Sequence, residues 1–400
     1  MRKAVFAKLG RVTGGSITVI DGDVKSTFGD RSADLHAVIQ VHDREFYRAI
    51  AFGGSIGAGE SYRDGLWSCD DLVALIQIFA RNMQTSSKLG GIWDSLLDLG
   101  RQVAHRLNRN TRSGSRRNIA AHYDLSNDFY SLFLDESMTY SSGVFPEPHS
   151  SMHDASIEKY DRICRKLRLT QSDEVLEIGT GWGGFAEHAA KHYGCRVTTT
   201  TISKQQHEHA RQRFHRNGID DRVTLLLSDY RDLTGHYDKL VSIEMIEAVG
   251  HEYFDTFFAK CSSLLKPDGL FALQAITIPD QRYDCYRKSV DFIQKHIFPG
   301  GCLPSLGAMS GAVGRVTDLQ FVHVEDFAEH YARTLESWRE RFHANIDSIR
   351  ELGMTDPFLR LWDYYFCYCE GAFREKQIGV AQLLLQKPGN RHSPQFPSLG

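Results

Sequence analysis

The stretch Glu177-Ile178-Gly179-Thr180-Gly181-Trp182-Gly183-Gly184 decides the fold class of this chain. It follows the apolar run 175–178, which predicts a short strand, and it leads into a predicted helix. Glycines at such a turn let the backbone approach a ligand closely. On an open α/β sheet, ligands bind beyond the carboxyl ends of the strands. The stretch therefore predicts a ligand-binding loop, and its Gly-x-Gly-x-x-Gly spacing leaves a dinucleotide as one alternative ligand.

The residues around this loop alternate between strand-like and helix-like segments. A helix is predicted over 204–216, between two of the apolar runs. The alternation favours a mostly parallel sheet with helices on both faces, which is a Rossmann-like α/β fold. The further predicted strands are 196–200, 223–227, 240–243 and 270–275.

Composition excludes several broad classes of protein. The net charge of −3 argues against a nucleic-acid partner, since such domains are usually basic. No apolar run approaches the ~20 residues of a membrane-spanning helix, and the start lacks the apolar run of a signal peptide. We therefore expect a cytoplasmic protein. Its eight scattered cysteines form no Cys-x-x-Cys pair, so we predict reduced thiols and no metal site.

Changes in composition along the chain predict four regions. Residues 1–100 predict a smaller α+β domain, and residues 119–388 predict the catalytic domain. Between them, residues 101–118 contain six arginines and no acidic residue. This linker is either a solvated connector or a contact for anionic lipid headgroups. Residues 389–400 are rich in Pro, Ser and Gly and predict a flexible tail.

A second glycine-rich stretch, Gly54-Ser55-Ile56-Gly57-Ala58-Gly59, lies in the N-terminal region. It resembles a phosphate-binding loop. It lacks the Lys-Ser/Thr ending that such loops use on phosphate and magnesium, so ATP binding is not predicted.

Two segments after the next predicted strands distinguish between the possible ligands of the first loop. The second strand ends in Thr201-Ile202-Ser203-Lys204-Gln205-Gln206, without the acidic residue that would hold a dinucleotide ribose. The third strand ends in Ser228-Asp229-Tyr230-Arg231. Together with the loop at Glu177, these segments are similar to the three cofactor segments of class I S-adenosylmethionine-dependent methyltransferases.

That resemblance implies a mostly parallel seven-stranded sheet. It also implies that the glycine loop passes the methionine part of S-adenosylmethionine, while Asp229 and Tyr230 flank the adenine. The predicted cofactor-binding residues are Tyr140, Ser141, Glu177, Gly179, Gly181, Gly183, Thr201, Ser203, Gln206, Asp229 and Tyr230.

Four longer segments narrow the family. They are RNIAAHYDLSNDFY at 117–130, MTYSSGVF at 138–145, EMIEAVGH at 244–251 and IFPGGCLPS at 297–305. Together they resemble the cyclopropane-fatty-acyl-phospholipid synthases and the related mycolic acid cyclopropane synthases. The resemblance runs from about residue 115 to 386 and more weakly over the N-terminal region, for which it implies a lipid-binding-like domain.

The family implies a mechanism. A cis double bond in an acyl chain attacks the sulfonium methyl group, and a base then removes a proton so that a ring closes. The family uses a bound bicarbonate as that base. By position, the resemblance implies that Glu247, Tyr331, the backbone near Ile276, Ser142 and Gln274 hold it. Taken alone, Glu247 could equally be a structural carboxylate, and Tyr331 a packing residue.

Two of these positions depart from the pattern of the best-known bacterial members. Ser142 stands where many members have Cys, and Gln274 stands where they have His. Both replacements can hydrogen-bond, but glutamine cannot carry a proton at neutral pH as histidine can. The plant cyclopropane synthases resemble this chain around Gln274, so ring formation remains compatible with it.

Four functions follow as alternatives. They are cyclopropanation of a phospholipid acyl chain, methyl transfer without ring closure, N-methylation of a small amine, and a non-catalytic lipid-binding role. For the first, the resemblance implies an unsaturated phospholipid as substrate and transient contact with the membrane surface. We expect peripheral association with the inner face of the membrane, and the resemblance leaves room for a homodimer.

Overall fold

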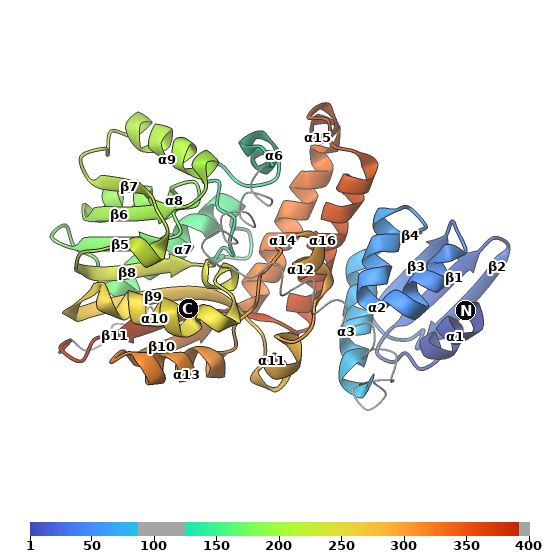
Figure 1. Ribbon diagram of the computed structural model, residues 1–400. Helices are drawn as coiled ribbons and strands as arrows, with labels where there is room; N and C mark the ends of the chain where they lie inside the picture. The colour runs from blue at the N-terminus through green and yellow to red at the C-terminus, as the bar shows by residue number, and fades with distance from the viewer. Residues whose placement is uncertain (87–124, 392–400) are drawn as a thin grey trace. The chain divides into compact units, whose positions relative to one another are not determined.

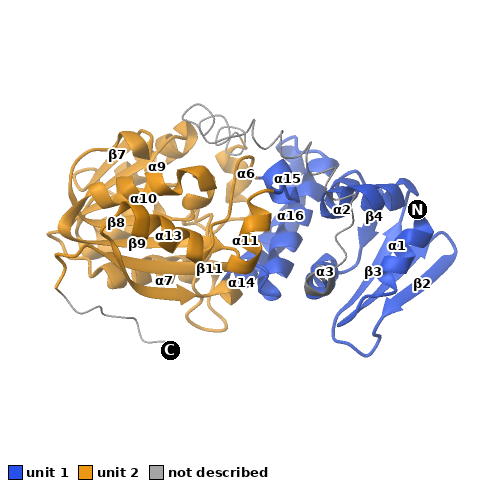
Figure 2. Cartoon of the chain, turned by 60° about the horizontal axis from the view of Figure 1, so that its bottom comes forward, with its two compact units in different colours: residues 1–104, 289–297, 331–378 blue, residues 105–288, 298–330, 379–400 orange. Residues whose placement is uncertain are grey.

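A computed structural model describes residues 1–86 and 125–391, and the chain divides into two compact units (Figures 1 and 2). Unit 1 takes in residues 1–104, 289–297 and 331–378. Unit 2 takes in residues 105–288, 298–330 and 379–400. Each unit has its own sheet, so each is described separately.

Unit 2 is built on a seven-stranded sheet in the order β10-β11-β9-β8-β5-β6-β7. Strands β9, β8, β5, β6 and β7 run parallel, while β11 pairs antiparallel with both β9 and β10. The mostly parallel seven-stranded sheet is therefore confirmed. The strands are β5 (Glu174–Ile178), β6 (Arg196–Thr201), β7 (Val223–Leu227), β8 (Tyr237–Ile243), β9 (Leu265–Thr277), β10 (Gln320–Asp326) and β11 (Gly379–Gln386).

Helices cover both faces of this sheet because successive strand residues point to opposite sides (Figure 1). Val175 packs in a core with residues of α7, α8 and α9, whereas its neighbour Leu176 packs with residues of α10 and α13. The helices of unit 2 are α6 (Asn127–Ser131), α7 (Met152–Leu167), α8 (Gly184–His188), α9 (Lys204–Arg216), α10 (Phe254–Ser263), α11 (Asp280–Tyr286) and α13 (Leu306–Val316).

Unit 1 combines a four-stranded sheet, ordered β2-β1-β3-β4, with a set of helices. Its strands are β1 (Ser16–Asp21), β2 (Val24–Gly29), β3 (His36–Val41) and β4 (Trp67–Cys69). Its helices are α1 (Arg2–Leu9), α2 (Glu45–Arg63), α3 (Leu72–Ser86), α12 (Phe292–His296), α15 (Ile346–Glu351) and α16 (Asp356–Arg374), together with most of α14 (Ala328–Ala344). The predicted α+β class of the N-terminal region is therefore correct.

The units differ from the predicted domain boundaries at 1–100 and 119–388. Residues 331–378 belong to unit 1, because α16 packs against both α2 and α3. The Tyr62 hydroxyl donates to Asp363 at 2.6 Å, and the Gln77 amide donates to Glu375 at 2.8 Å. These partners lie about three hundred residues apart, so local composition could not reveal them.

The glycine-rich stretch at 54–59 is part of helix α2, which has a kink at Gly54, where φ is 56°. Gly59 lies on its buried face, against Phe292 and Tyr364. The stretch therefore forms a kinked helix, in which Gly54 allows the kink and Gly59 a close packing contact.

Two other predicted regions lie largely outside the described residues. These are the arginine-rich linker 101–118 and most of the tail 389–400. The first tail residues are held in place, since the Gly389 N–H donates to the Pro267 carbonyl and the Asn390 amide to Asp268. In the described part of the chain, no helix has the length and apolar character needed to cross a membrane.

We predict that Gly59→Ala destabilises unit 1 by about 1 to 3 kcal/mol, because the added methyl group overpacks a filled contact. A Cβ at this position would overlap the Phe292 ring and lie 2.8 Å from the Tyr364 ring. Thermal unfolding measures the effect. Gly53→Ala in the same helix is the control, since its Cβ meets nothing within 4 Å. Equal melting temperatures for the two variants would contradict this packing.

Candidate active site

The predicted cofactor segments meet at one edge of the sheet in unit 2. Strands β5, β6 and β7 are parallel neighbours, so the loops after Ile178, Thr201 and Leu227 leave the same edge (Figure 1). Strand β8 pairs with the other side of β5, and its carboxyl end brings Glu244 and Glu247 to that edge as well. This is the edge where open α/β sheets bind ligands.

The glycine loop has the backbone geometry that the sequence predicts. Gly179, Gly181 and Gly183 adopt φ values of 106°, 53° and 91°, which side chains disfavour. A Cβ on Gly183 would lie 2.8 Å from the Phe214 ring. A Cβ on Gly181 would meet nothing within 4 Å. The loop therefore leaves open space beside its central glycine, where a ligand can approach the backbone.

Glu177 precedes this loop and is fully buried. The Thr199 hydroxyl donates to its carboxylate at 2.6 Å. Burial raises the pKa of Glu177 to about 8, although that hydrogen bond and Lys159 oppose the shift. The carboxyl group thus links β5 to β6 beside the loop and holds a proton more tightly than a surface glutamate.

Thr201, Ser203 and Gln206 form a compact turn between β6 and α9. The Ser203 N–H donates to the Thr201 hydroxyl at 3.1 Å, and that hydroxyl donates to Oε1 of the Gln206 side chain at 2.9 Å. Ser203 also caps α9 by accepting the Gln206 N–H. The three residues predicted as cofactor ligands are therefore brought together and oriented by one another.

Asp229 and Tyr230 lie at the end of β7 in a small 3₁₀ turn. The Arg231 guanidinium donates to both Asp229 carboxylate oxygens, at 2.8 and 2.7 Å. The Tyr230 ring packs edge-on against Phe257 with centroids 5.5 Å apart. No role was predicted for Arg231 from the sequence. In the structure it is the group that orients Asp229.

Tyr140 and Ser141 approach the site from the segment before α7. The Tyr140 ring contacts the rings of Tyr130 and Phe298, with centroids 5.5 and 6.3 Å apart. The Ser141 hydroxyl accepts a hydrogen bond of 2.6 Å from the Lys159 ammonium. Ser141 is thus tied to helix α7.

Lys159 was not predicted from the sequence. Its side chain is fully buried, and burial lowers its pKa to about 8, while the nearby carboxylates of Glu244, Asp135 and Glu177 oppose that shift. A lysine in a helix is ordinarily a surface residue, so only the buried positions around it could have signalled this one.

Glu247 has one satisfied and one unsatisfied carboxylate oxygen. The Ile276 N–H donates to its Oε1 at 2.6 Å. Its Oε2 is buried and has no hydrogen-bond partner among the described residues. Burial, followed by repulsion from Glu244, raises the pKa of Glu247 to about 8. The carboxyl group is therefore largely neutral at pH 7, and within residues 1–86 and 125–391 its Oε2 meets no hydrogen-bond partner.

Glu244 connects the other two predicted residues of this site. Its Oε1 accepts the Ser142 N–H at 2.9 Å and the Gln274 side-chain N–H at 2.8 Å. The Ser142 hydroxyl donates to the Gly143 carbonyl at 3.0 Å. Glu244 was not predicted from the sequence, and its positive φ of 47° marks it as a special position in the structure.

Four of the five predicted anion-holding residues therefore lie together in unit 2: Ser142, Gln274, Ile276 and Glu247. The fifth, Tyr331, belongs to unit 1. There its ring stacks on Phe373 with centroids 4.4 Å apart. Its predicted role stays a prediction.

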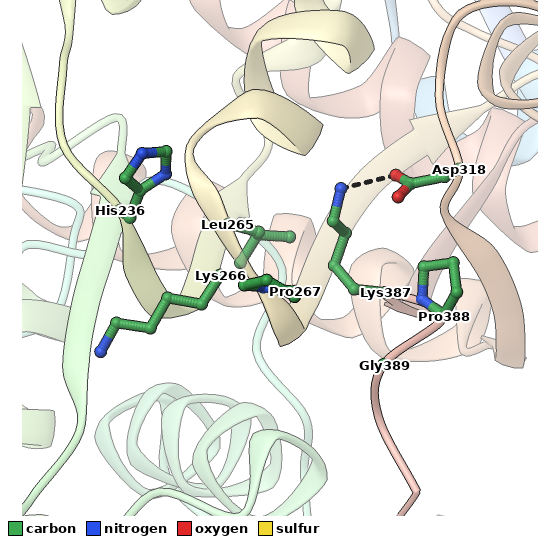
Figure 3. A pocket seen from close by; sticks show the side chains of 8 residues that line it. All are labelled: His236, Leu265, Lys266, Pro267, Asp318, Lys387, Pro388 and Gly389. Atoms are coloured by element: carbon green, nitrogen blue, oxygen red, sulfur yellow. Dashed lines mark hydrogen bonds and ion pairs between the residues drawn. The ribbon is translucent and has the colours of Figure 1, made fainter.

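A cavity of about 570 Å³ lies at the amino ends of β8 and β9, across the sheet from the glycine loop (Figure 3). Its lining includes Lys266 and Lys387. The Lys266 ammonium donates to Asp238 at 2.7 Å, and the Lys387 ammonium donates to Asp318 at 2.6 Å. Its position away from the carboxyl ends of the parallel strands separates it from the cofactor segments.

Comparison with known proteins decides the family. A family model described as mycolic acid cyclopropane synthetase matches residues 110–383. The chain belongs to this family. It is an S-adenosylmethionine-dependent methyltransferase of the cyclopropane synthase type, which transfers a methylene or methyl group to fatty acids.

Two curated relatives align with most of this chain. It is 40% identical over 349 residues to the tuberculostearic acid methyltransferase of Mycobacterium tuberculosis, covering 86% of this chain and 81% of the relative. It is 36% identical over 357 residues to the cyclopropane-fatty-acyl-phospholipid synthase of Escherichia coli K12, covering 88% of each chain.

A solved structure agrees. A mycolic acid cyclopropane synthase crystallised with SAH (S-adenosylhomocysteine) and CTAB matches this family member with a TM-score of 0.64. The two are 32% identical, and the match covers 68% of this chain and 98% of that one. The predicted Rossmann-like class I methyltransferase fold is thereby confirmed.

We predict that Lys159→Met weakens the binding of S-adenosylhomocysteine roughly tenfold to a hundredfold, since a charge-assisted hydrogen bond contributes about 1.5 to 3 kcal/mol. The loss would come from Ser141, which would no longer be held by the ammonium. Isothermal titration calorimetry measures it. Lys191→Met is the control, because that lysine lies at the surface and pairs with Glu187. Unchanged affinity in a folded Lys159→Met protein would refute this role.

Proposed function

We propose that this enzyme transfers the methyl carbon of S-adenosylmethionine to a cis double bond in the unsaturated acyl chain of a phospholipid and closes a cyclopropane ring. The phospholipid substrate is supported by the name of the E. coli relative, which this chain matches over 88% of its length. Ring closure is supported by the chemistry available at Glu247.

The unpaired oxygen of Glu247 carries this proposal. The Ile276 N–H can only donate, so Oε1 of Glu247 acts as an acceptor. The proton of the neutral carboxyl group then resides on Oε2, the buried oxygen without a described partner. A carboxylic acid kept neutral by burial can donate a hydrogen bond to an anion. Glu247 therefore fits the role of holding a small anion such as bicarbonate.

A bicarbonate bound there would supply the base that removes a proton from the transferred carbon. Glu247 would hold it by donating from Oε2, and the neighbouring Ser142 hydroxyl offers a further donor if it leaves the Gly143 carbonyl. Both N–H groups of Gln274 are directed elsewhere, one at 2.8 Å from Glu244 and one at 3.5 Å from the Ser142 carbonyl. Gln274 therefore acts through Glu244 and Ser142.

The methyl donor would lie along the glycine loop and the turn at Thr201, with Asp229 held by Arg231 for the adenosine end. This ligand would occupy the open space beside Gly181. Near the reacting carbon, the aromatic rings of Tyr140 and Phe298 would keep water away from the cationic chain and offer it their faces.

A second candidate is methyl transfer without ring closure, which gives a methyl-branched chain. It is favoured by the 40% identity to a relative named as a methyltransferase of tuberculostearic acid. It is also favoured by Gln274, which has no titratable proton to pass to or from the base. The two candidates share the methyl-transfer step and differ in the fate of the cation.

We predict that the purified enzyme transfers label from S-adenosylmethionine to vesicles of a cis-monounsaturated phospholipid, with a cyclopropane fatty ester as the product by gas chromatography–mass spectrometry. Glu247→Leu should lower kcat by about a hundredfold or more, because leucine has no donor to hold the base. Glu208→Leu, at a half-exposed position on α9, is the control. A methyl-branched product would favour the second candidate, and absence of label in lipid would exclude both.

The pKa of Glu247 also predicts a pH dependence of stability. Its folded-state pKa of about 8 lies above the ordinary glutamate value of 4.5, so the folded protein binds more protons than the unfolded chain between these values. Its contribution to stability is therefore present below about pH 4.5 and is lost as pH rises through about 8. Glu247→Gln should become progressively more stable than wild type over this range in thermal unfolding. A constant difference with pH would contradict the raised pKa.

A further inference from the structure

A row of polar side chains crosses the sheet of unit 2 beside the candidate site. Glu325 on β10 lies opposite Gln382 on β11, and Gln382 lies opposite Gln274 on β9. Gln274 in turn lies opposite Ile243, the last residue of β8, which Glu244 follows. Gln382 and Gln274 are 2% and 1% exposed, so their amides depend on protein partners for hydrogen bonds.

Helix α7 supplies a cation to this row. Lys166 is 1% exposed, and its ammonium donates to Gln382 Oε1 at 2.7 Å and to Glu325 at 2.6 Å. Burial lowers the pKa of Lys166 to about 8, while Glu325 opposes the shift, so the amine is protonated at neutral pH.

Hydrogen bonds continue from there to the candidate site without a break. The Gln382 side-chain N–H donates to Gln274 Oε1 at 3.0 Å. The Gln274 side-chain N–H donates to Glu244 Oε1 at 2.8 Å, and the same oxygen accepts the Ser142 N–H. Lys166 is thus connected to Ser142 through two amides and one carboxylate.

The chemistry of the two ends fixes the direction of every bond in this row. An ammonium can only donate, so the group of Gln382 that faces Lys166 must be its oxygen. Gln382 then presents its NH₂ to Gln274, whose oxygen must face it. The NH₂ of Gln274 is left to face Glu244. At the other end, the Ser142 N–H requires the same oxygen of Glu244 to be an acceptor.

We infer that Lys166 is a positioning residue that acts through Gln382 to hold the amide of Gln274 in its donating orientation toward Glu244, and so holds Ser142 in place. The inference rests on the proposed function only in that Ser142, Gln274 and Glu244 line the reacting site. Without the ammonium, both amides can turn over together, and an amide oxygen then faces the Glu244 carboxylate in a buried place.

The test compares Lys166→Met with Arg162→Met. Methionine keeps the length of the lysine and removes its donor. Arg162 lies one turn earlier on α7 and pairs with the same Glu325, but it donates to neither amide, so it is a matched control for the lost ion pair. Lys166→Arg should restore function in part, because guanidinium also only donates.

Two readouts are measured at pH 7. In the vesicle assay we expect Lys166→Met to lower kcat about tenfold or more with KM for S-adenosylmethionine within about twofold, since misplaced groups cost rate. By hydrogen exchange with mass spectrometry, we expect faster exchange of the peptide containing Ser142. Arg162→Met should resemble wild type in both measurements.

Gln382→Glu is a second variant that keeps the acceptor for Lys166 and removes the donor to Gln274. It should lose rate as Lys166→Met does, and it remains informative if that variant fails to fold. Wild-type kcat in either variant would overturn the inference, as would equal losses in Lys166→Met and Arg162→Met. If wild type labels no lipid, the proposed function fails, while hydrogen exchange still decides whether Lys166 positions Ser142.

Discussion

Two carboxyl groups three residues apart, those of Glu244 and Glu247, impose the constraint on which the candidate site depends. Glu244 is partly buried, and Oε2 of Glu247 is buried. A buried carboxyl group needs hydrogen-bond donors, and the cost of leaving it without them is several kcal/mol. Glu244 takes its donors from Ser142 and Gln274, and Glu247 takes one from the Ile276 backbone. These donors come from two separate segments of the chain, the one around Ser142 and strand β9. The segments that carry them are therefore held at the end of β8.

The same constraint separates the roles of the two carboxyl groups. The Ser142 N–H and the Gln274 side-chain N–H both donate to one oxygen of Glu244. Oε1 of Glu247 accepts the Ile276 N–H, while Oε2 has no hydrogen-bond partner among the described residues. Repulsion from Glu244 adds to burial in raising the pKa of Glu247. Glu244 therefore positions Ser142 and Gln274, while Glu247 retains a proton that it can donate to a ligand. Helix α7 contributes two buried lysines. Lys159 donates to Ser141, and Lys166 donates to Gln382 in the row of amides.

Much of this arrangement could be predicted from the sequence, because the signals were local. The predicted helix 204–216 has the bounds of α9, and the runs at 196–200 and 223–227 fall in β6 and β7. The glycine loop was recognisable because only glycine adopts its φ values easily. The candidate residues after β5, β6 and β8 follow from the way parallel strands end at one edge.

The parts that could not be predicted depend on contacts between distant segments. The packing of α16 on α2 and α3 moves residues 331–378 into unit 1, and no local pattern signals it. Lys159 and Lys166, seven residues apart, lie on one face of α7, but lysine is usually exposed, so their burial depends on carboxylates and amides brought there by the sheet. The glycines of α2 are spaced like those of a phosphate-binding loop, but in the structure they lie in a helix that packs against Phe292 and Tyr364.

The central claim is that a base at Glu247 removes a proton from the transferred methyl group. It is tested most directly with S-adenosylmethionine whose methyl group is fully deuterated and vesicles of a cis-monounsaturated phospholipid. Mass spectrometry of the fatty esters then counts the deuterons retained. The account predicts a cyclopropane product that keeps two of the three deuterons, because one leaves with the base. A product that keeps all three would contradict it, since the proton would then have come from the acyl chain.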